Sequence, residues 1–376
     1  MESSIKTDKF TKFSAHQIIP ENVLLTGFIN NPGIKQIEIS PTDACNQNCQ
    51  WCFTVSARES KEKMSLVQLK KILDDFHLQG GISIVISGGG EPLLYSGLIT
   101  ANNIFGDKSI LEYCFNFGFT VGLITNGVYL DKLVKAIDIK KLAFLRVSID
   151  TLNEDDYYSL HGAKKEHFQT VIKNITIASN QRLGSHTPAL GLSFIVDTES
   201  NLNSNNDSII AINTFVKKLN IDFVQFKHLH TTNIELAQKS LLKVHYFARQ
   251  LEWLNTEFWV QEYHSPKPHE VCYVTKIIQS FGNKDKVFPC CHLFGNTNYI
   301  EQKGQLKTEV VIKNCPSKVC RYVSINNLLT EVESGVSVDK AINTLKQSIE
   351  EHGFHPYRYF PTAPDLIFPV TAEKTS

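Results

Sequence analysis

The stretch Cys45-Asn-Gln-Asn-Cys49-Gln-Trp-Cys52 places three cysteines within eight residues. Three thiolates this close together can each bind one iron of a four-iron, four-sulfur cluster, which usually has four cysteine ligands. One iron would then lack a protein ligand and stay open to another molecule. The residues just before this stretch, Gln36–Ser40, alternate between polar and apolar, and Pro41 follows them. This pattern predicts a strand that leads into a cysteine loop.

Two other uses of these cysteines remain open at this point. A zinc ion needs four tetrahedral ligands, so the triplet would have to recruit a distant residue such as Cys272. A disulfide is disfavoured by the odd local number of cysteines and by the lack of a secretory context. The spacing therefore favours an iron–sulfur cluster over both alternatives.

The composition is that of an ordinary globular protein, with 376 residues, of which 42% are hydrophobic and 20% charged. The formal net charge is zero, so nothing in the charge balance suggests a nucleic acid or an anionic membrane as partner. No segment reaches the ~18 uninterrupted apolar residues of a membrane span, and residues 1–13 lack the apolar core of a signal peptide. We therefore expect a cytoplasmic protein whose nine cysteines stay reduced and available for metals.

Strand-like and helix-like segments alternate along the first two thirds of the chain. Short apolar, often β-branched runs are each followed by a polar turn, and amphipathic patterns such as residues 66–76 and 168–179 lie between them. Such alternation predicts right-handed crossovers and a parallel sheet. The six predicted strands are residues 36–40, 82–87, 119–124, 143–149, 190–196 and 223–226.

The turn after the second predicted strand reads Gly88-Gly-Gly-Glu91, about 40 residues beyond the cysteine triplet. This turn and the triplet, with Trp51 just before the last cysteine, together resemble the motifs of the radical SAM enzymes. The resemblance implies an α/β fold, a partial (β/α)6 TIM-type barrel with a small cysteine-containing C-terminal extension. The six predicted strands agree with that barrel.

The resemblance also implies cofactors and partners. Cys45, Cys49 and Cys52 would hold a 4Fe–4S cluster whose open iron chelates S-adenosylmethionine. One electron, from a donor such as flavodoxin or ferredoxin, would cleave S-adenosylmethionine to methionine and a 5′-deoxyadenosyl radical. That radical would abstract a hydrogen atom from the substrate, while the protein positions and shields it.

Polar residues near the predicted strand ends are candidates for binding S-adenosylmethionine. In Arg146-Val-Ser-Ile-Asp150, residues 146, 148 and 150 point to one face of the strand, and a polar face on a buried strand needs partners. A ligand or an internal hydrogen-bond network would supply them. Asn126 is a further candidate, although a plain turn with Gly127 also accounts for it. The resemblance assigns the binding of S-adenosylmethionine to Gly89, Gly90 and Glu91, with Glu91 bonded to the amino group of its methionine part. It assigns Ser148 and Asp150 to the ribose hydroxyls or the carboxylate of S-adenosylmethionine. Trp51 would pack near the cluster and the adenine.

A second group of cysteines follows the predicted barrel. Cys272 precedes an expected helical stretch, and Cys290, Cys291, Cys315 and Cys320 come after it. The group resembles the twitch form of the SPASM extension, which carries one auxiliary iron–sulfur cluster, but the interval before Cys290 is longer than usual. The resemblance implies a second cluster ligated by Cys272, Cys290, Cys315 and Cys320. The alternatives are a structural zinc ribbon or cysteines that are buried in the core without a ligand role.

Cys290 and Cys291 are adjacent, so in an extended segment their side chains point to opposite sides and do not both reach one cluster. The pattern of the extension makes Cys290 the ligand. Cys291 is then a candidate donor of a hydrogen atom to a substrate carbon radical, which would make the net reaction redox-neutral at the substrate, for example an epimerisation. The alternative is a buried, small apolar side chain.

We expect four parts: an N-terminal segment (1–35), the barrel (36–262), the twitch-like region (263–325), and a C-terminal helix with an irregular tail (326–376). Enzymes with such extensions modify peptides, sugars or aminocyclitols, so the expected substrate is a small molecule of that kind or a peptide. The expected outcome is oxidation, crosslinking or epimerisation. The few residues before Cys45 favour a small molecule over the leader-guided maturation of a peptide. An alternative of another class is a non-catalytic, zinc-stabilised binding protein.

Overall fold

A computed structural model gives the fold of the chain between residues 31 and 343, with gaps. No helix in the described ranges is both long and apolar enough to cross a membrane. The described residues are 31–52, 54, 61–185, 187–196, 206–229, 235–236, 239–240, 242–244, 258–261, 270–283, 286–293, 301–302, 311–313, 315, 322–337, 339–341 and 343.

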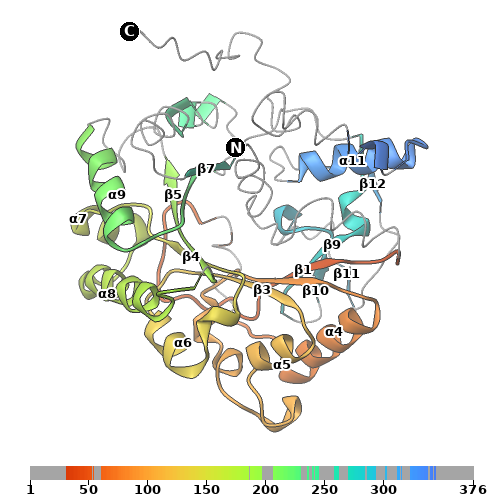
Figure 1. Ribbon diagram of the computed structural model, residues 1–376, viewed down its shortest axis with the longest axis horizontal. Helices are drawn as coiled ribbons and strands as arrows, with labels where there is room; N and C mark the ends of the chain where they lie inside the picture. The colour runs from red at the N-terminus through yellow and green to blue at the C-terminus, as the bar shows by residue number, and fades with distance from the viewer. Residues whose placement is uncertain are drawn as a thin grey trace.

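One ten-stranded sheet organises the structure, with the order β11-β10-β9-β1-β2-β3-β4-β5-β6-β7 (Figure 1). The eight strands from β9 to β7 are parallel, whereas β10 is antiparallel to both β9 and β11. The strands are β1 (Gln36–Ile39), β2 (Ser83–Ile86), β3 (Thr120–Thr125), β4 (Phe144–Ser148), β5 (Ala189–Val196), β6 (Phe223–His228), β7 (Phe258–Gln261), β9 (Ile278–Phe281), β10 (Lys286–Phe288) and β11 (Glu301–Gln302). A separate pair joins β8 (Val271–Cys272) and β12 (Ile312–Lys313).

The six predicted strands are β1 to β6, so the α/β fold with a parallel, partial TIM-type barrel is confirmed. Two more parallel strands extend the sheet, β7 beside β6 and β9 beside β1. The prediction of a helical stretch after Cys272 is wrong. A short 3-10 turn, Val274–Lys276, is followed there by β9. Pairing of β9 with the buried strand β1 supplies backbone hydrogen bonds that favour a strand over a helix in this segment.

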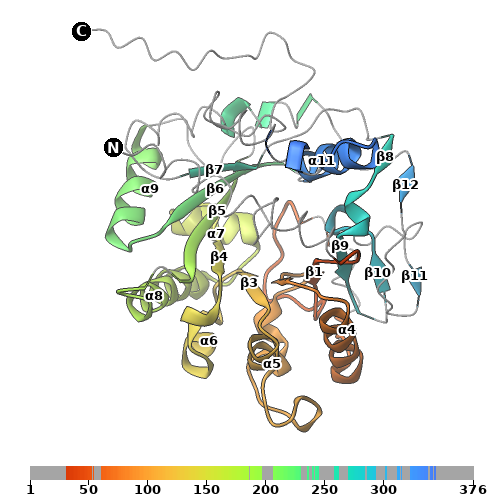
Figure 2. The same cartoon turned by 45° about the vertical axis from the view of Figure 1, so that its right-hand side comes forward.

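The helices follow the strands along the chain. α4 begins where the Ser65 hydroxyl accepts a hydrogen bond from the Gln68 amide at 3.1 Å, as the sequence predicts for its N-cap. Figure 2 shows α4, α5, α6 and α8 along one side of the sheet. The helices are α4 (Leu66–Leu78), α5 (Ile110–Asn116), α6 (Leu130–Ala136), α7 (Glu154–His161), α8 (Lys165–Gln181), α9 (Asn206–Lys218) and α11 (Val323–Glu333).

The two faces of the sheet belong to different apolar cores. Alternate strand residues such as Ile37 and Ile39 pack with the helices in the larger core. The opposite face contributes Val85, Phe144 and Phe223 to a second core, which it shares with the C-terminal segment. The interior of the partial barrel is therefore filled in part by residues beyond 270.

Two glycines make room for aromatic rings on this inner face. Gly122 pairs with Phe144, and a Cβ on Gly122 would lie 2.1 Å from that ring. Gly191 pairs with Phe223, and a Cβ there would lie 2.0 Å from its ring. Any larger residue at position 122 or 191 would displace the paired phenylalanine ring from the inner face of the sheet.

The sheet crosses the boundary predicted at residues 262 and 263, because β9 is the direct neighbour of β1. The end of the predicted N-terminal segment is also part of the fold, since Ile34 and Lys35 are buried. The C-terminal helix is α11, which begins at Val323. The four-part division itself stays a prediction, and most of the tail expected after this helix lies outside the described residues.

Candidate functional site

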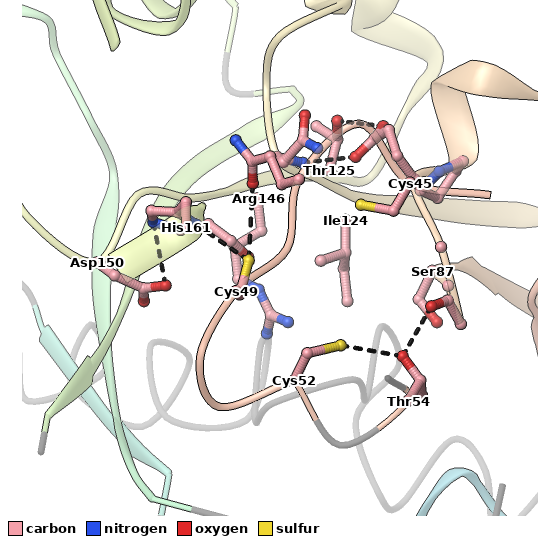
Figure 3. Close-up of a pocket in the computed structure, with 18 of the residues that line it drawn as sticks. Cys45, Cys49, Cys52, Thr54, Ser87, Ile124, Thr125, Arg146, Asp150 and His161 are labelled. Carbon is pink, nitrogen blue, oxygen red and sulfur yellow. Dashed lines mark hydrogen bonds and ion pairs between the residues drawn. The ribbon is translucent and has the colours of Figure 1, made fainter. Parts of the chain in front are cut away.

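The three cysteines lie on the loop that leaves β1, at the end of the strands where α/β barrels place their active sites. Cys45, Cys49 and Cys52 are all partly exposed, and all three line one cavity of about 210 Å³. Figure 3 shows them around this cavity, on one continuous loop. The sequence prediction that the triplet forms one site is consistent with this arrangement.

Two of the sulfur atoms have polar neighbours within the site. Cys49 Sγ lies 3.2 Å from Nδ1 of His161, and Cys52 Sγ lies 3.2 Å from the hydroxyl of Thr54 (Figure 3). The same hydroxyl donates to the carbonyl of Gly89 at 2.7 Å, so Thr54 joins the cysteine loop to the glycine turn. Sequence reasoning missed Thr54 and did not predict the contact between His161 and Cys49.

The glycine turn after β2 packs directly on the cysteine loop. Gly90 N donates to the carbonyl of Thr42 at 3.0 Å, and Glu91 N donates to the carbonyl of Ala44 at 2.8 Å. A Cβ on Gly90 would lie 2.1 Å from the carbonyl oxygen of Ala44. Glycine at a strand end can allow the backbone to approach a ligand closely. The contact that requires glycine at position 90 is with the neighbouring loop.

Glu91 is buried at 2% exposure and accepts three hydrogen bonds. Its Oε1 accepts from Leu93 N at 3.0 Å and from the Thr125 hydroxyl at 2.7 Å, and its Oε2 accepts from Asn126 N at 2.8 Å. Burial raises the pKa of Glu91, and these hydrogen bonds oppose the rise. The carboxylate thus ties the end of β2 to the end of β3. A carboxylate has about four acceptor positions, which leaves room for one further donor.

Asn126 forms a turn with the residues that follow it and also takes part in the site. Its Oδ1 accepts from Val128 N at 3.1 Å, as in an Asx turn. Its Nδ2 donates to Oδ1 of Asn46 at 2.7 Å, so the side chain also reaches the cysteine loop. Asn126 lines the cavity with Glu91 and Trp51.

Arg146, Ser148 and Asp150 all line the cavity, while Val147 and Ile149 belong to the core under the helices. The alternation predicted for this strand is confirmed. Each of the three polar side chains has an internal partner. Arg146 donates to Gln225 Oε1, Ser148 Oγ accepts from the Ser193 hydroxyl at 3.3 Å, and Asp150 Oδ1 accepts from Ile195 N at 2.7 Å.

The cavity contains charges of both signs. Glu38, Glu91 and Asp150 are acidic, and Arg146 and Lys227 are basic. Sequence reasoning missed Glu38, which is buried and accepts a hydrogen bond from the Ser87 hydroxyl at 2.5 Å. The signal available in the sequence was the alternation of polar residues at positions 36, 38 and 40, which puts them on the inner face of β1.

The second group of cysteines lies in the inner core. Cys272, Cys290, Cys291 and Cys315 are each less than 9% exposed and share one apolar cluster. Burial raises the pKa of Cys272 to about 11, and the nearby Cys315 thiol adds to the rise. Cys320, the fourth predicted ligand, lies outside the described residues. In the described part of the chain, no three His, Cys, Asp or Glu side chains converge on the position of a single metal ion.

Cys291 lies apart from the main cavity. It lines a smaller cavity of about 20 Å³, and its Sγ is 3.5 Å from the hydroxyl of Tyr322. The two cavities share a wall formed by Glu38, Ser87, Gly88 and Gly89. The backbone of the glycine turn therefore separates the Cys291 thiol from the main cavity.

Comparison with known proteins shows which family part of this chain matches. The model of the radical SAM superfamily matches residues 39–197. A GTP 3′,8-cyclase of Synechocystis sp. is 27% identical over 150 residues, which are 39% of this chain and 42% of the relative. An uncharacterized protein of Methanocaldococcus jannaschii is 30% identical over 174 residues, 46% of this chain and 52% of the relative. The chain thus spans about half the length of these curated relatives.

A solved structure shares the fold. Streptococcus suis SuiB bound to S-adenosylmethionine superposes with a TM-score of 0.53 at 16% identity, over 74% of this chain and 66% of that one. The cysteine loop, the glycine turn, Ser148 and Asp150 all fall within the residues that the family model matches. This chain therefore carries a domain of the radical SAM superfamily, whose members bind a 4Fe–4S cluster and S-adenosylmethionine.

Proposed function

We propose that this protein is a radical SAM enzyme that holds a 4Fe–4S cluster on Cys45, Cys49 and Cys52 and S-adenosylmethionine in the cavity beside them. The observation that carries the proposal is that the three cysteines share one cavity of about 210 Å³ with Gly89–Glu91, Ser148 and Asp150. The donor set fits the cluster, because three thiols are offered and a fourth iron is left for the cofactor.

The residues around the cavity have separate tasks in this proposal. When bound, the cluster and S-adenosylmethionine together supply a 5′-deoxyadenosyl radical that abstracts a hydrogen atom from a substrate. Glu91 has one acceptor position left for the cofactor amino group, beside the three that the protein fills. Ser148 and Asp150 offer oxygens to ribose or carboxylate groups. Trp51 lines the cavity, and its apolar ring would help to keep water from the reactive carbon.

For the substrate we propose a small polar molecule of the sugar or aminocyclitol kind. Arg146, Lys227 and Glu38 line the same cavity and offer both charges to polar groups. A peptide is the second candidate, because the SuiB fold also occurs bound to the precursor peptide SuiA, at a TM-score of 0.52 and 16% identity. Oxidation, crosslinking and epimerisation are the outcomes to be distinguished, and a flavodoxin or ferredoxin is the proposed electron donor.

We also propose that Cys272, Cys290, Cys315 and Cys320 hold an auxiliary iron–sulfur cluster. Support comes from the burial of the first three in one apolar cluster and from the proximity of Cys272 and Cys315. Burial of this kind excludes solvent, which stabilises a cluster against loss. The alternative is a structural zinc ion on the same thiols.

The test is reductive cleavage of S-adenosylmethionine by anaerobically reconstituted protein. With dithionite as reductant, the wild type should release 5′-deoxyadenosine. The Cys45→Ala/Cys49→Ala/Cys52→Ala variant should release none and lose about half of its iron. Cys114→Ala, which removes a buried cysteine far from the site in sequence, is the matched control and should cleave normally. Cleavage by the triple variant would overturn the proposal.

Metal analysis of the same triple variant tests the auxiliary cluster. Remaining iron and sulfide would support it, and a further loss of that iron on Cys272→Ala would locate it. Zinc in place of the remaining iron would show that the C-terminal site is structural. Zinc alone in the wild type, with a colourless protein, would favour the non-catalytic alternative.

A further inference from the structure

The C-terminal end of α7 lies against the middle of the cysteine loop. Asn48 N donates to the carbonyl of His161 at 2.7 Å, and Gln50 N donates to the carbonyl of Leu160 at 3.0 Å. The last carbonyls of a helix have no acceptor role within the helix itself. These two are therefore used to hold the backbone on either side of Cys49.

Side chains strengthen the same contact. Gln47 Nε2 donates to the hydroxyl of Tyr157 at 2.7 Å, and both residues are buried. His161 Nδ1 lies 3.2 Å from Cys49 Sγ, and its Nε2 lies 3.1 Å from the carbonyl of Ile149. The ring of Tyr157 packs on that of His161 with centroids 4.3 Å apart. The imidazole is thus fixed from three sides.

Gly162 ends α7 and brings the helix close to the loop. Its φ of +49° is in the left-handed region, which favours glycine. A Cβ on Gly162 would lie 2.9 Å from the carbonyl oxygen of Asn48 and 3.1 Å from its Cβ. Any side chain at position 162 would therefore push the loop away from the helix.

We propose that the C-terminal end of α7, through Tyr157, His161 and Gly162, is the positioning element that sets Cys49 in its ligand position before a cluster is bound. The inference rests on the proposed function for the identity of the ligand. Its physical reason is that α7 supplies two backbone hydrogen bonds, of 2.7 and 3.0 Å, to the residues on either side of Cys49, whereas the contact within the loop from Cys52 N to Cys49 O is longer, at 3.3 Å. A preformed loop then loses less conformational entropy when it binds the cluster.

Gly106 offers a matched control for Gly162. It also ends a helical turn with a positive φ, +63°, but no atom lies within 4 Å of a Cβ built on it. Gly→Ala therefore carries the same left-handed penalty at both positions, and the clash with the loop occurs at Gly162 alone of the two. A difference between the two variants isolates the contact with the cysteine loop.

The first measurement is hydrogen–deuterium exchange on the metal-free full chain, in fragments that cover residues 45–52. Gly162→Ala should raise exchange there about tenfold, as expected for one or two lost backbone hydrogen bonds. Gly106→Ala should leave these fragments as in the wild type. Equal protection in both variants and the wild type would overturn the proposal.

The second measurement concerns the loaded protein. Tyr157→Phe removes the acceptor of Gln47 and keeps the ring, with Tyr113→Phe as its control on α5. Tyr157→Phe should change the electron paramagnetic resonance spectrum of the reduced cluster, because the loop that holds Cys49 shifts, whereas Tyr113→Phe should not. An unchanged spectrum in Tyr157→Phe would count against the proposal. If the wild type itself takes up no iron, the proposed function fails, while the exchange measurement still decides whether α7 holds the loop.

Discussion

Asn283, in the turn between β9 and β10, donates a hydrogen bond from its side chain to the carboxylate of Asp43, two residues before Cys45. Both side chains are at least 96% buried. A second contact runs alongside, from Ser40 N to the carbonyl of Phe281 at 2.8 Å. The turn between β9 and β10 thus braces the start of the cysteine loop, although 240 residues separate the two partners.

This relationship predicts that Asn283→Ala weakens the barrel and the loop together. Loss of the amide leaves a buried carboxylate with one partner fewer, which should lower the free energy of unfolding by about 1–3 kcal/mol. Denaturant unfolding of the metal-free protein measures this. The exposed Asn103→Ala is the control and should stay within about 0.5 kcal/mol of the wild type. Equal stability of the two variants would contradict the prediction.

A second prediction concerns Glu91→Gln. The carboxylate accepts three hydrogen bonds in a buried position, and an amide would turn an NH2 group toward at least one of these donors. We expect a loss of about 1–3 kcal/mol in the free energy of unfolding, together with weaker binding of S-adenosylmethionine. Glu154→Gln, at an exposed position on α7, should change neither property. Calorimetry measures the binding of S-adenosylmethionine, and denaturant unfolding measures the stability. If Glu91→Gln leaves both as in the wild type, Glu91 does not link the ends of β2 and β3.

The strands of the sheet show which parts of the fold could be predicted from the sequence and which could not. The strands β1 to β6 were predictable because β1 alternates polar and apolar residues and each of the others is a short, mainly apolar run bounded by a polar turn. β9 was not, because the segment Ile278–Phe281 becomes a strand through its pairing with β1, far away in sequence. Local pattern carries no information on that partner.

The site divides in the same way. The cysteines, the glycine turn and Ser148 are recognisable because spacing and alternation mark them. Thr54 and Thr125 are ordinary residues in the sequence, and they gain a role through contacts with Gly89 and Glu91 that span 35 and 34 residues. Such contacts depend on how two loops pack, which the pattern of either loop alone does not determine.

A third prediction follows from the burial of His161. Its imidazole is 1% exposed, and burial lowers its pKa from the ordinary value of 6.5, with the Asp150 carboxylate opposing the shift. Below about pH 6.5 the unfolded chain therefore binds more protons than the folded chain at this residue. The folded state loses stability as the pH falls through this range.

The measurement is the free energy of unfolding of the metal-free protein at about pH 7.5 and 5.5, on either side of the ordinary histidine pKa. His161→Phe should show a smaller loss on acidification than the wild type. The exposed His77→Phe should keep the loss of the wild type. A His161→Phe variant with the full pH dependence would assign the effect to other groups.

The last prediction concerns Cys291 as a hydrogen-atom donor. Its thiol lines a cavity of about 20 Å³ that shares Gly88 and Gly89 with the main cavity, so glycine backbone without side chains stands between them. If the thiol donates its hydrogen atom to a carbon radical, one C–H bond forms and a thiyl radical remains, which one electron from the reductant and one proton restore. A thiol exchanges with deuterated water, so the hydrogen it donates there is deuterium.

In deuterated water, with dithionite and a substrate, the wild type should therefore release a product that carries deuterium at the carbon that was a radical. Cys291→Ala should release the same product with clearly less label, and Cys114→Ala, at another buried cysteine, should match the wild type. Mass spectrometry of the product measures the label. If Cys291→Ala and the wild type give the same deuterium content, Cys291 is not the donor. Its burial in the apolar cluster beside Tyr322 then describes its whole role, that of a small side chain filling the inner core.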